Sequence, residues 1–459
     1  MRRKEVTLFP KVLALAILLA GLLASSFCPP VAKADSTHGS RLGLETRADG
    51  YPRRLKLLYN PYGSVNWSTY KQYKAQLHSH SSQSDGNKSP EGVIDAYNSA
   101  NFKVLCITDH DGPTGVYSPG PTWPWTRWGR DPSAVGMVAI EGNELTQQGK
   151  HHITSLYGSV GSSSLTNEDA WLADIDNQDG LAYFCHPSWH VNCSLDAYRF
   201  AKSLSWYKGL LSNHPCLLGL EILSPVGSDL NGVAYNMKLW DDILMDMADS
   251  RGVWGFGSDD AHYYPSRVGF GWNVVIVNKL TDAKVRAAFE SGQFYFSYRY
   301  STGDTCPSMD SLVVDEANGT ISVKANNYTS IQWICNGTVV STGTTIRYVD
   351  NAYITKYVRV TLRNGTAWTC LQPITFTVDT ATPTDPAEVP SDAADTTTPT
   401  DPTGTIPDKD VDTAPSSNPT GAPNWFFAVM VMTAGLLVSG ICIVVTLRAC
   451  KPRWFRGSW

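Results

Sequence analysis

The strongest constraint on the fold of this chain is a series of short apolar runs, each with histidine, aspartate or glutamate at or near one end. The runs read AQLHSH, VLCITDHD, MVAIEGNEL, HHITSLYG, LAYFCHP, LLGLEILSP and VWGFGSDDAH. Apolar strands that alternate with helical stretches are typical of a parallel sheet buried on both faces. In a closed barrel of such strands, the carboxyl ends gather at one rim, where such folds carry their chemistry. The run HHITSLYG has its histidines at its start, so it indicates an antiparallel strand or a departure from the repeat.

The pattern changes after about Tyr300, where apolar and polar residues alternate and Asn-Gly pairs recur. Alternation with such turns is typical of antiparallel strands joined by hairpins. Residues 301–380 are therefore predicted to form a small all-β sandwich with an immunoglobulin-like core around Trp333, Cys335 and Cys370. A Cys335–Cys370 disulfide and two free core thiols are both compatible with this pattern.

Both ends of the chain carry segments that predict targeting to a membrane. Residues 1–34 combine a basic start, an apolar run and an A-x-A pattern, which indicate a signal peptide that is removed. Residues 424–447 are uncharged and long enough to cross a hydrocarbon core of ~30 Å. Residues 381–423, rich in Thr, Pro and Asp, predict a disordered stalk, and residues 448–459 predict a basic cytoplasmic tail. The chain is thus expected to be a single-pass protein of the cell membrane, with its bulk extracellular and its C-terminus in the cytoplasm.

Cysteine content and charge narrow the function of the extracellular part. Seven cysteines lie between residues 35 and 380, which leaves at least one free thiol, and no C-x-x-C pair indicates a thiolate zinc site. The formal net charge of −5 gives no sign of a broad basic face for nucleic acid. The sequence also lacks a G-x-S-x-G elbow and a P-loop, so serine-hydrolase and nucleotide-motor functions find no support.

Nine histidines and carboxylates in and around the apolar runs form a pattern suited to metal. They are His78, His80, Asp85, His110, Glu144, His152, His186, Asp260 and His262. His78 and His80 lie two residues apart, so their rings point to the same side of a strand end. Neutral imidazole together with carboxylate favours zinc, manganese or iron over calcium or magnesium. Nine ligands exceed the four that one tetrahedral ion needs, so two or three divalent ions that share carboxylates are expected.

The order of these motifs resembles that of the polymerase and histidinol phosphatase (PHP) superfamily of metallohydrolases, over roughly Leu77 to Tyr264. The matching motifs are His78-Ser79-His80 with Asp85-Gly86, Thr108-Asp109-His110-Asp111, Gly142-Asn143-Glu144, His186-Pro187 and Ser258-Asp259-Asp260-Ala261-His262. The resemblance implies a metal-dependent hydrolase domain over residues 35–300, with the α/β fold of a distorted (β/α)7 TIM-like barrel.

The resemblance also selects between neighbouring candidates for metal binding. It favours His152 over the adjacent His151, and its D-x-H spacing favours Asp260 over Asp259. Asp259 and Asp111 are then expected beside the ligands, with Asp259 orienting a histidine.

The implied reaction is hydrolysis by a metal-bound hydroxide, and it suits phosphomonoesters and phosphodiesters because metal ions neutralise their charge. Nucleotides, oligonucleotides and wall phosphopolymers are candidate substrates. Lys150, His190 and Arg267 are candidates to contact the phosphate, although His190 also fits a turn cap. Two alternatives remain open. One is hydrolysis of carboxylesters or carbamates, and the other is a surface binding protein without catalysis.

Two further residues belong to no motif of the resemblance. Glu221 ends an apolar run, and it fits a structural hydrogen-bonding role and a catalytic role equally well. His214 precedes a proline and is predicted to be a surface histidine outside the site.

Overall fold

A computed structural model of the chain describes residues 54–111, 122–161, 167–194, 196, 199–223, 230–301 and 303–378. These residues all belong to one compact unit, residues 1–383. The predicted signal peptide, stalk, transmembrane helix and cytoplasmic tail lie outside the described residues. Among the helices that are described, none combines the length and the apolar character needed to span a membrane.

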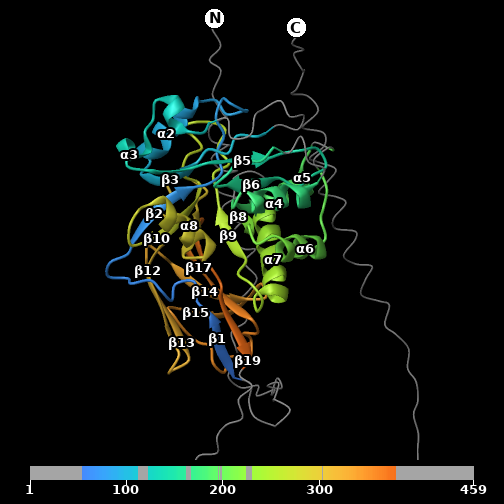
Figure 1. Ribbon diagram of the computed structural model, residues 1–459. Coiled ribbons are helices and arrows are strands. Elements are labelled where there is room, and N and C mark those ends of the chain that lie inside the picture. Colours follow the sequence, from blue (N-terminus) through green and yellow to red (C-terminus); the bar gives the residue numbers. More distant parts are fainter. Residues whose placement is uncertain are drawn as a thin grey trace, which may run out of the picture. The chain divides into compact units, whose positions relative to one another are not determined.

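The first sheet contains eleven strands, and its central part is built from residues of both predicted domains (Figure 1). Its order is β1-β19-β17-β18-β11-β10-β2-β3-β4, and β14 and β15 join through β17. The bounds of the strands on the N-terminal side are β2 Lys71–Gln76, β3 Phe102–Cys106, β4 Val138–Ile140, β10 Gly271–Val277 and β11 Phe294–Tyr298. The pairs β2–β3 and β3–β4 are parallel, whereas β10 is antiparallel to both of its neighbours.

The second sheet has the order β5-β6-β7-β8-β9. Its strands are β5 Gly142–Leu145, β6 Ile153–Leu156, β7 Leu181–Phe184, β8 Leu217–Leu223 and β9 Trp254–Gly257. The pairs β7–β8 and β8–β9 are parallel, while β6 runs antiparallel to β5 and β7. Strand β6 is the run HHITSLYG, so the antiparallel alternative for that run is confirmed.

The sheets of the described strands do not form a closed barrel, so the predicted TIM-like barrel is not confirmed. Apart from a separate sheet of three C-terminal strands, the described strands fall into the two sheets above, which meet at one rim through two isolated parallel bridges, Ser79–Ala261 and His110–Glu144. Only Glu141 separates β4 from β5, so the chain passes from one sheet to the other within one residue. Gly142 permits this passage because a Cβ atom there would lie 2.3 Å from the Ser155 carbonyl oxygen.

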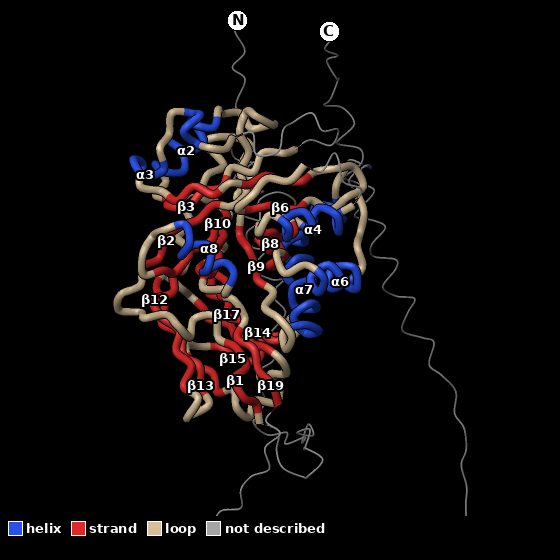
Figure 2. Tube along the Cα trace, viewed as in Figure 1, coloured by secondary structure: helices blue, strands red, loops and turns tan. Residues whose placement is uncertain are grey.

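Helices are fewer than a regular β/α repeat requires, and Figure 2 shows them on the outside of the sheets. They are α2 Pro90–Ser99, η1 Trp125–Trp128, α3 Pro132–Val135, α4 Glu168–Asn177, α5 Pro187–Asn192, α6 Leu204–Asn213, α7 Leu230–Met247 and α8 Asp282–Glu290. In α2, Pro90 occupies the first turn, where no amide hydrogen bond is lost, and Glu91 lies near the positive end of the helix. No described helix separates β4 from β5 or β5 from β6, so the connections there are direct.

The C-terminal residues form eight described β strands, as predicted, of which β12, β13 and β16 make a separate three-stranded sheet and the other five share the first sheet with the N-terminal part. They are β12 Ser308–Asp315, β13 Thr320–Asn326, β14 Ser330–Cys335, β15 Thr338–Thr342, β16 Thr345–Arg347, β17 Tyr357–Asn364, β18 Ala367–Leu371 and β19 Ile374–Val378. Strand β18 pairs with β11, and β19 pairs with β1, Leu55–Tyr59. Pairing therefore crosses the predicted boundary at residue 300. A single buried cluster includes Phe102 and Trp272 from one side and Trp333 from the other.

The cysteines of the described residues are all free thiols, including Cys335 and Cys370. Cys335 lies on β14 and Cys370 on β18, and β17 separates these two strands in the sheet. Each is buried within the core, which agrees with the alternative of two free core thiols.

Candidate metal centre

The two histidines at the end of β2 point into one cluster because the chain between them is fixed to its neighbours. Ser79 donates its hydroxyl to the Cys106 carbonyl oxygen at 3.2 Å. The amide of His80 donates to the Ala261 carbonyl at 2.9 Å, and the amide of Asp260 donates to the His78 carbonyl at 3.1 Å. The ends of β2 and β9 are thereby held together, and the two imidazole centroids lie 5.2 Å apart.

Glu144 on β5 is the centre of the cluster, and its side chain is fully buried. Its carboxylate oxygens lie within 3.5 Å of a nitrogen of five imidazoles. The distances are 2.9 Å to His110, 2.9 Å to His152, 3.2 Å to His186, 3.3 Å to His78 and 3.5 Å to His80. These side chains come from five separate segments of the chain, so the fold itself assembles the group.

The remaining ligand candidates adjoin this centre. Asp260 Oδ1 lies 3.0 Å from His80 Nε2 and 3.4 Å from His78 Nε2. Asp85 Oδ2 lies 3.2 Å from His262 Nε2 and 3.6 Å from His110 Nε2. All nine residues that the sequence predicts as metal ligands therefore lie in one connected cluster.

Two of the nine residues have a positive φ angle, a backbone conformation that residues other than glycine rarely adopt. His186 has φ of 26° and Asp260 has φ of 44°. Such conformations cost of order 1–3 kcal/mol each and occur preferentially at functional sites. Both residues lie just after a strand, and the side chains of both contact other members of the cluster.

The buried carboxylates and imidazoles shift one another's pKa values strongly. Burial opposes protonation of His78 and His110, but the surrounding carboxylates outweigh it and raise the pKa of both imidazoles well above the ordinary value. Burial is likewise outweighed at His262, whose pKa rises to about 9. Burial and neighbouring imidazoles lower the pKa of His80 to about 4. For Glu144, the imidazoles overcome burial and hold its pKa well below the usual range.

The side chains of the adjacent pairs point in different directions. His152 faces Glu144, whereas His151 Nε2 lies 3.0 Å from the Tyr207 hydroxyl, away from the carboxylates. Asp260 faces His78 and His80, whereas Asp259 accepts hydrogen bonds from the amides of residues 269–271 and from the Tyr97 hydroxyl. The geometry thus agrees with the choice of His152 and Asp260. Asp259 fixes the chain beside Asp260, although it was expected to orient a histidine.

Glu221 holds two members of the cluster in place, a role that the sequence left undecided. Its Oε1 lies 2.7 Å from His78 Nδ1, and its Oε2 accepts the amide of His186 at 2.8 Å. Thr146 does the same for His110, with its hydroxyl 2.7 Å from Nδ1. Asp111 accepts the Thr146 amide at 2.9 Å, so Asp111 supports a ligand through an intermediate residue, close to its expected role.

The residues predicted to contact substrate are more scattered. His190 is buried, and its Nε2 accepts the amide of His152 at 3.1 Å, so it supports a ligand candidate. Lys150 is partly exposed in the turn before His151. Arg267 is exposed, and its guanidinium lies 6.0 Å from the centroid of the Phe270 ring.

His214 is buried rather than exposed, so its prediction as a surface histidine is wrong. Its two ring nitrogens each lie 2.9 Å from a carboxylate, those of Asp169 and Asp176. It follows the end of α6 directly, and both carboxylates that cover it belong to α4.

The arrangement fits divalent metal ions of the transition series. Within the described residues, the donor atoms form four groups that could each hold an ion. They are His78, Glu144, Cys185 and His186; His80, Asp85, His110 and His262; His152, His186 and His190; and His78, His80 and Asp260. Nδ1 of His80 and Nδ1 of His186 are buried and have no hydrogen-bond partner among the described residues. Buried polar atoms without a partner are costly, and a bound cation removes that cost.

Comparisons with known proteins give similarities of low identity. No family model and no curated protein matches the chain. A two-domain protein of Bacteroides vulgatus, described as containing a proposed PHP-like metal-dependent phosphoesterase, is similar at a TM-score of 0.42 and 15% identity, over 71% of this chain and 91% of that one. A proposed metal-dependent phosphoesterase of Bifidobacterium adolescentis is similar at a TM-score of 0.31 and 12% identity, over 47% of this chain and 96% of that one. A lesion-specific endonuclease of Pyrococcus furiosus is similar at a TM-score of 0.31 and 16% identity, over 48% of this chain and 56% of that one.

Proposed function

We propose that this chain is a metal-dependent hydrolase of the PHP type that cleaves phosphoesters. The observation that carries the proposal is the assembly of six histidines and three carboxylates in one cluster around Glu144, with all but one side chain largely buried. A purely structural protein gains nothing from such a group, since buried charges destabilise a fold unless they are fully paired. The clustered residues therefore favour catalysis over the alternative of a surface binding protein.

The residues of the cluster divide into a buried part and an open part. His78, Glu144 and His186 are enclosed, whereas the side chain of Asp85 is 49% exposed and that of His262 is 23% exposed. Substrate would therefore approach from the side of Asp85 and His262. Two or three zinc, manganese or iron ions at this centre would supply a hydroxide at neutral pH and neutralise phosphoester charge.

The side chains around the cluster preorganise it. Glu221 holds Nδ1 of His78, so this ring presents Nε2 to Glu144. Thr146 contacts Nδ1 of His110, the nitrogen beside Glu144, and Nε2 of that ring faces Asp85. The enclosed position of Glu144 excludes water from its carboxylate, which strengthens its interaction with any cation. We further propose that Lys150 and Arg267 contact the substrate phosphate from the open side.

Metal content and activity together test the proposal. We expect the purified chain from metal-replete medium to hold two or three zinc, manganese or iron ions, and to hydrolyse p-nitrophenyl phosphate or bis-p-nitrophenyl phosphate. Elemental analysis that finds less than one ion per chain would exclude a multinuclear centre. Activity on p-nitrophenyl acetate alone would identify the carboxylester alternative instead.

We also propose that the hydrolase domain is extracellular and anchored by residues 424–447. The basic residues after this segment and the A-x-A pattern near residue 34 support the proposal. Protease added to intact cells should cut within residues 381–423 and release the catalytic part. Digestion that occurs only after lysis would reverse the orientation.

A further inference from the structure

A cavity on the outer face of the first sheet is lined by three cationic side chains. It has a volume of about 620 Å³ and lies between β2, β10, β11 and residues 303–308. The cations are Lys74, Lys103 and Arg299, and Asp304 is the one carboxylate among the described residues that line it. The cavity is separate from the metal cluster, because none of the nine ligand candidates lines it.

Lys74 is the residue that most needs a partner in this cavity. Its ammonium lies over the rings of Trp272, at 4.9 Å from the centroid, and Phe102, at 5.5 Å. No hydrogen bond or ion pair joins this ammonium to another side chain within the described part of the chain. Burial, and then the positive charge of Arg299, lower the pKa of Lys74. The ammonium is therefore partly desolvated, and the negative charge of Asp259 offsets only part of this cost.

Arg299 brings a second positive charge to the same ring. The carbon of its guanidinium lies 5.6 Å from the Trp272 centroid, and its Nε donates to the Gly269 carbonyl at 2.6 Å. Two cations that share one indole ring repel each other unless an anion lies between them. Asp304 is tied to other groups through one oxygen, because its Oδ2 accepts from the Ser301 amide at 3.2 Å and the Thr366 hydroxyl at 2.6 Å.

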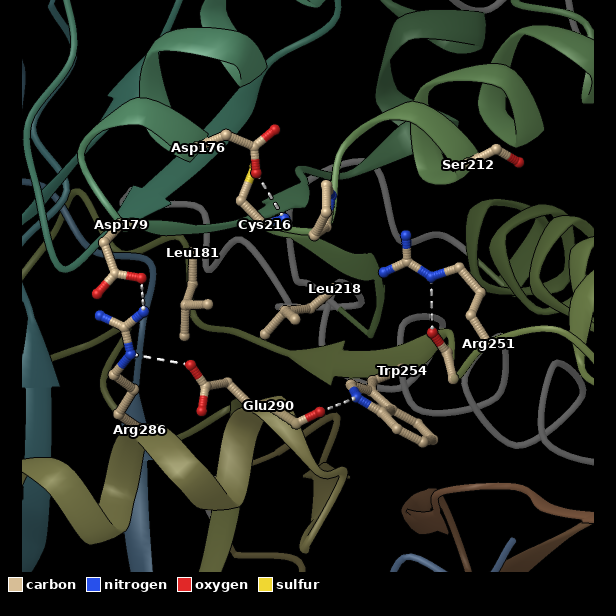
Figure 3. Close-up of a pocket in the computed structure, with 13 residues that line it drawn as sticks. Asp176, Asp179, Leu181, Ser212, Cys216, Leu218, Arg251, Trp254, Arg286 and Glu290 are labelled. Atoms are coloured by element: carbon tan, nitrogen blue, oxygen red, sulfur yellow. Dashed lines mark hydrogen bonds and ion pairs between the residues drawn. The ribbon is translucent and has the colours of Figure 1, made fainter. Parts of the chain in front are cut away.

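A larger cavity of about 770 Å³ provides a contrast (Figure 3). There, Arg286 pairs with Asp179 at 3.0 Å and with Glu290 at 2.9 Å. Arg251 donates to main-chain carbonyl oxygens, including that of Gly252 at 3.2 Å. Both arginines of this larger cavity thus have carboxylate or carbonyl partners within the protein. Neither is available to an anion in the way that the Lys74 ammonium is.

We propose that the cavity beside Lys74 binds a phosphate dianion between Lys74 and Arg299. A tetrahedral oxyanion accepts several charge-assisted hydrogen bonds and would offset the repulsion of the two cations. Lys103 is the third cation that lines the cavity. The volume exceeds that of a phosphate ion and falls in the range of organic ligand sites, so an organic group that carries the phosphate can be accommodated.

Substitution of Lys74 tests the proposal on the full-length chain, by titration calorimetry with inorganic phosphate as the probe. Lys74→Met keeps an unbranched apolar stem over Trp272 and removes the charge, so we expect affinity to fall about 10- to 100-fold. Lys74→Arg keeps the charge and should restore binding. The matched control is Lys71→Met, on the same strand but exposed and outside the cavity, which should bind as the wild type does.

The measurement is made on the chain as purified and again after chelation of metal, since a metal centre also binds phosphate. Binding that depends on Lys74 should persist after chelation, because the cavity shares no residue with the metal cluster. Equal affinity of Lys74→Met and wild type would overturn the proposal, as would the absence of phosphate binding by the chelated wild type. Either failure leaves the hydrolase proposal intact.

A second probe, glycerol 3-phosphate, identifies the source of the phosphate in the chelated chain. Tighter binding of the ester than of the free ion supports a site for an organic phosphate. Equal affinity supports a site for inorganic phosphate, the product that a phosphomonoesterase releases. Free glycerol is the control without phosphate. If it binds more tightly than either phosphate probe, and Lys74→Met has no effect on its binding, the cavity is not a phosphate site.

Discussion

Glu144 is the residue on which the candidate centre depends most. Its buried carboxylate lies near five imidazoles, and the described part of the chain provides it with no lysine or arginine partner. An isolated carboxylate in such a position is strongly unfavourable. In the metal-free chain, protonated imidazoles must therefore compensate it. In the metal-bound chain, cations would take over that role and the imidazoles would be neutral.

This exchange predicts an unusual pH dependence for the metal-free chain. The pKa of His262 is raised to about 9, above its ordinary 6.5, so its contribution to stability is full below pH 6.5 and is lost as the pH rises through about 9. The pKa of His80 is lowered to about 4, so stability also decreases as the pH falls below 6.5. Melting temperatures of the chelated chain should peak near pH 6.5, whereas metal affinity should increase from pH 6 to 9. A melting temperature that climbs steadily to pH 9 would contradict this assignment.

Substitution of a single ligand candidate should abolish activity without unfolding the chain. His80→Ala removes a ring that lies 3.0 Å from Asp260 and 3.5 Å from Glu144, so metal occupancy and hydrolysis should both be lost. The measurements are metal content, melting temperature and activity per folded molecule. Full metal loading together with wild-type activity would show that this histidine is not a ligand.

His214→Ala is the matched control for His80→Ala, since both histidines are buried beside carboxylates. His214 lies outside the cluster, so its loss should lower the melting temperature but leave metal content and activity per folded molecule unchanged. Equal loss of metal in the two variants would mean that instability, rather than ligation, explains the effect.

Glu221 allows a test of positioning as distinct from ligation. Glu221→Gln should weaken the hold on His78 Nδ1 and on the His186 amide, and such changes typically reduce metal affinity 10- to 100-fold. Competition with a chromophoric chelator measures the dissociation constant. Glu290→Gln, the same change at an exposed site on α8, should have no effect. Identical metal affinities of the two variants would show that Glu221 does not position the ligands of the centre.

The sequence identified residues that the structure gathers into one cluster, because their signal is local. Residues two apart on a strand, such as His78 and His80, point to the same face, and this can be read from the sequence alone. Glu221 and Thr146 gave no such signal, because each acts through a contact with a residue far away in the chain. His214 misled for the same reason, since carboxylates of a different helix bury it.

At the scale of elements, α7 and β17 are joined by a buried ion pair. Asp241 on α7 accepts two hydrogen bonds from Arg359, at 2.8 and 2.7 Å, and one from the Tyr357 hydroxyl. Asp241→Ala would leave a buried guanidinium without its partner and should lower the free energy of unfolding by about 3–5 kcal/mol. Urea denaturation followed by circular dichroism measures the change.

The neighbouring residue provides the control for Asp241→Ala. Asp242 pairs with Lys238, whose side chain is 72% exposed, so Asp242→Ala should change stability by about 0–1 kcal/mol. Equal effects of the two substitutions would mean that the buried pair does not stabilise the junction of helix and sheet.

The strands themselves were predictable, but their partners were not. Apolar runs and alternation identified β7, β8 and β9 and the C-terminal strands, since these patterns reflect burial of each segment. Closure of a barrel depends on which edges meet, and the passage from β4 to β5 through Glu141 is decided by long-range packing. The pairing of β11 with β18 likewise joins segments about 70 residues apart, for which no local pattern exists.

At the scale of the whole molecule, the shared first sheet predicts that residues 54–378 unfold together. The ladder between β11 and β18 and the buried cluster around Phe102 and Trp333 connect the N-terminal and C-terminal parts. Scanning calorimetry of the metal-free chain should therefore show one cooperative transition. Two separated transitions would indicate that residues 301–380 form an independent domain, as the change of sequence pattern at Tyr300 suggested.

The pairing of β1 with β19 has a topological consequence. Leu55, near the start of the described chain, is the register partner of Val378 at its end, and the two strands lie side by side at the lower edge in Figure 1. Residues 54–378 thus trace almost a closed loop, which begins and finishes at the same place on the surface. Such a loop can be joined with a short linker and reopened elsewhere, or carried as an insertion between two points of a host chain, with every strand keeping its neighbours.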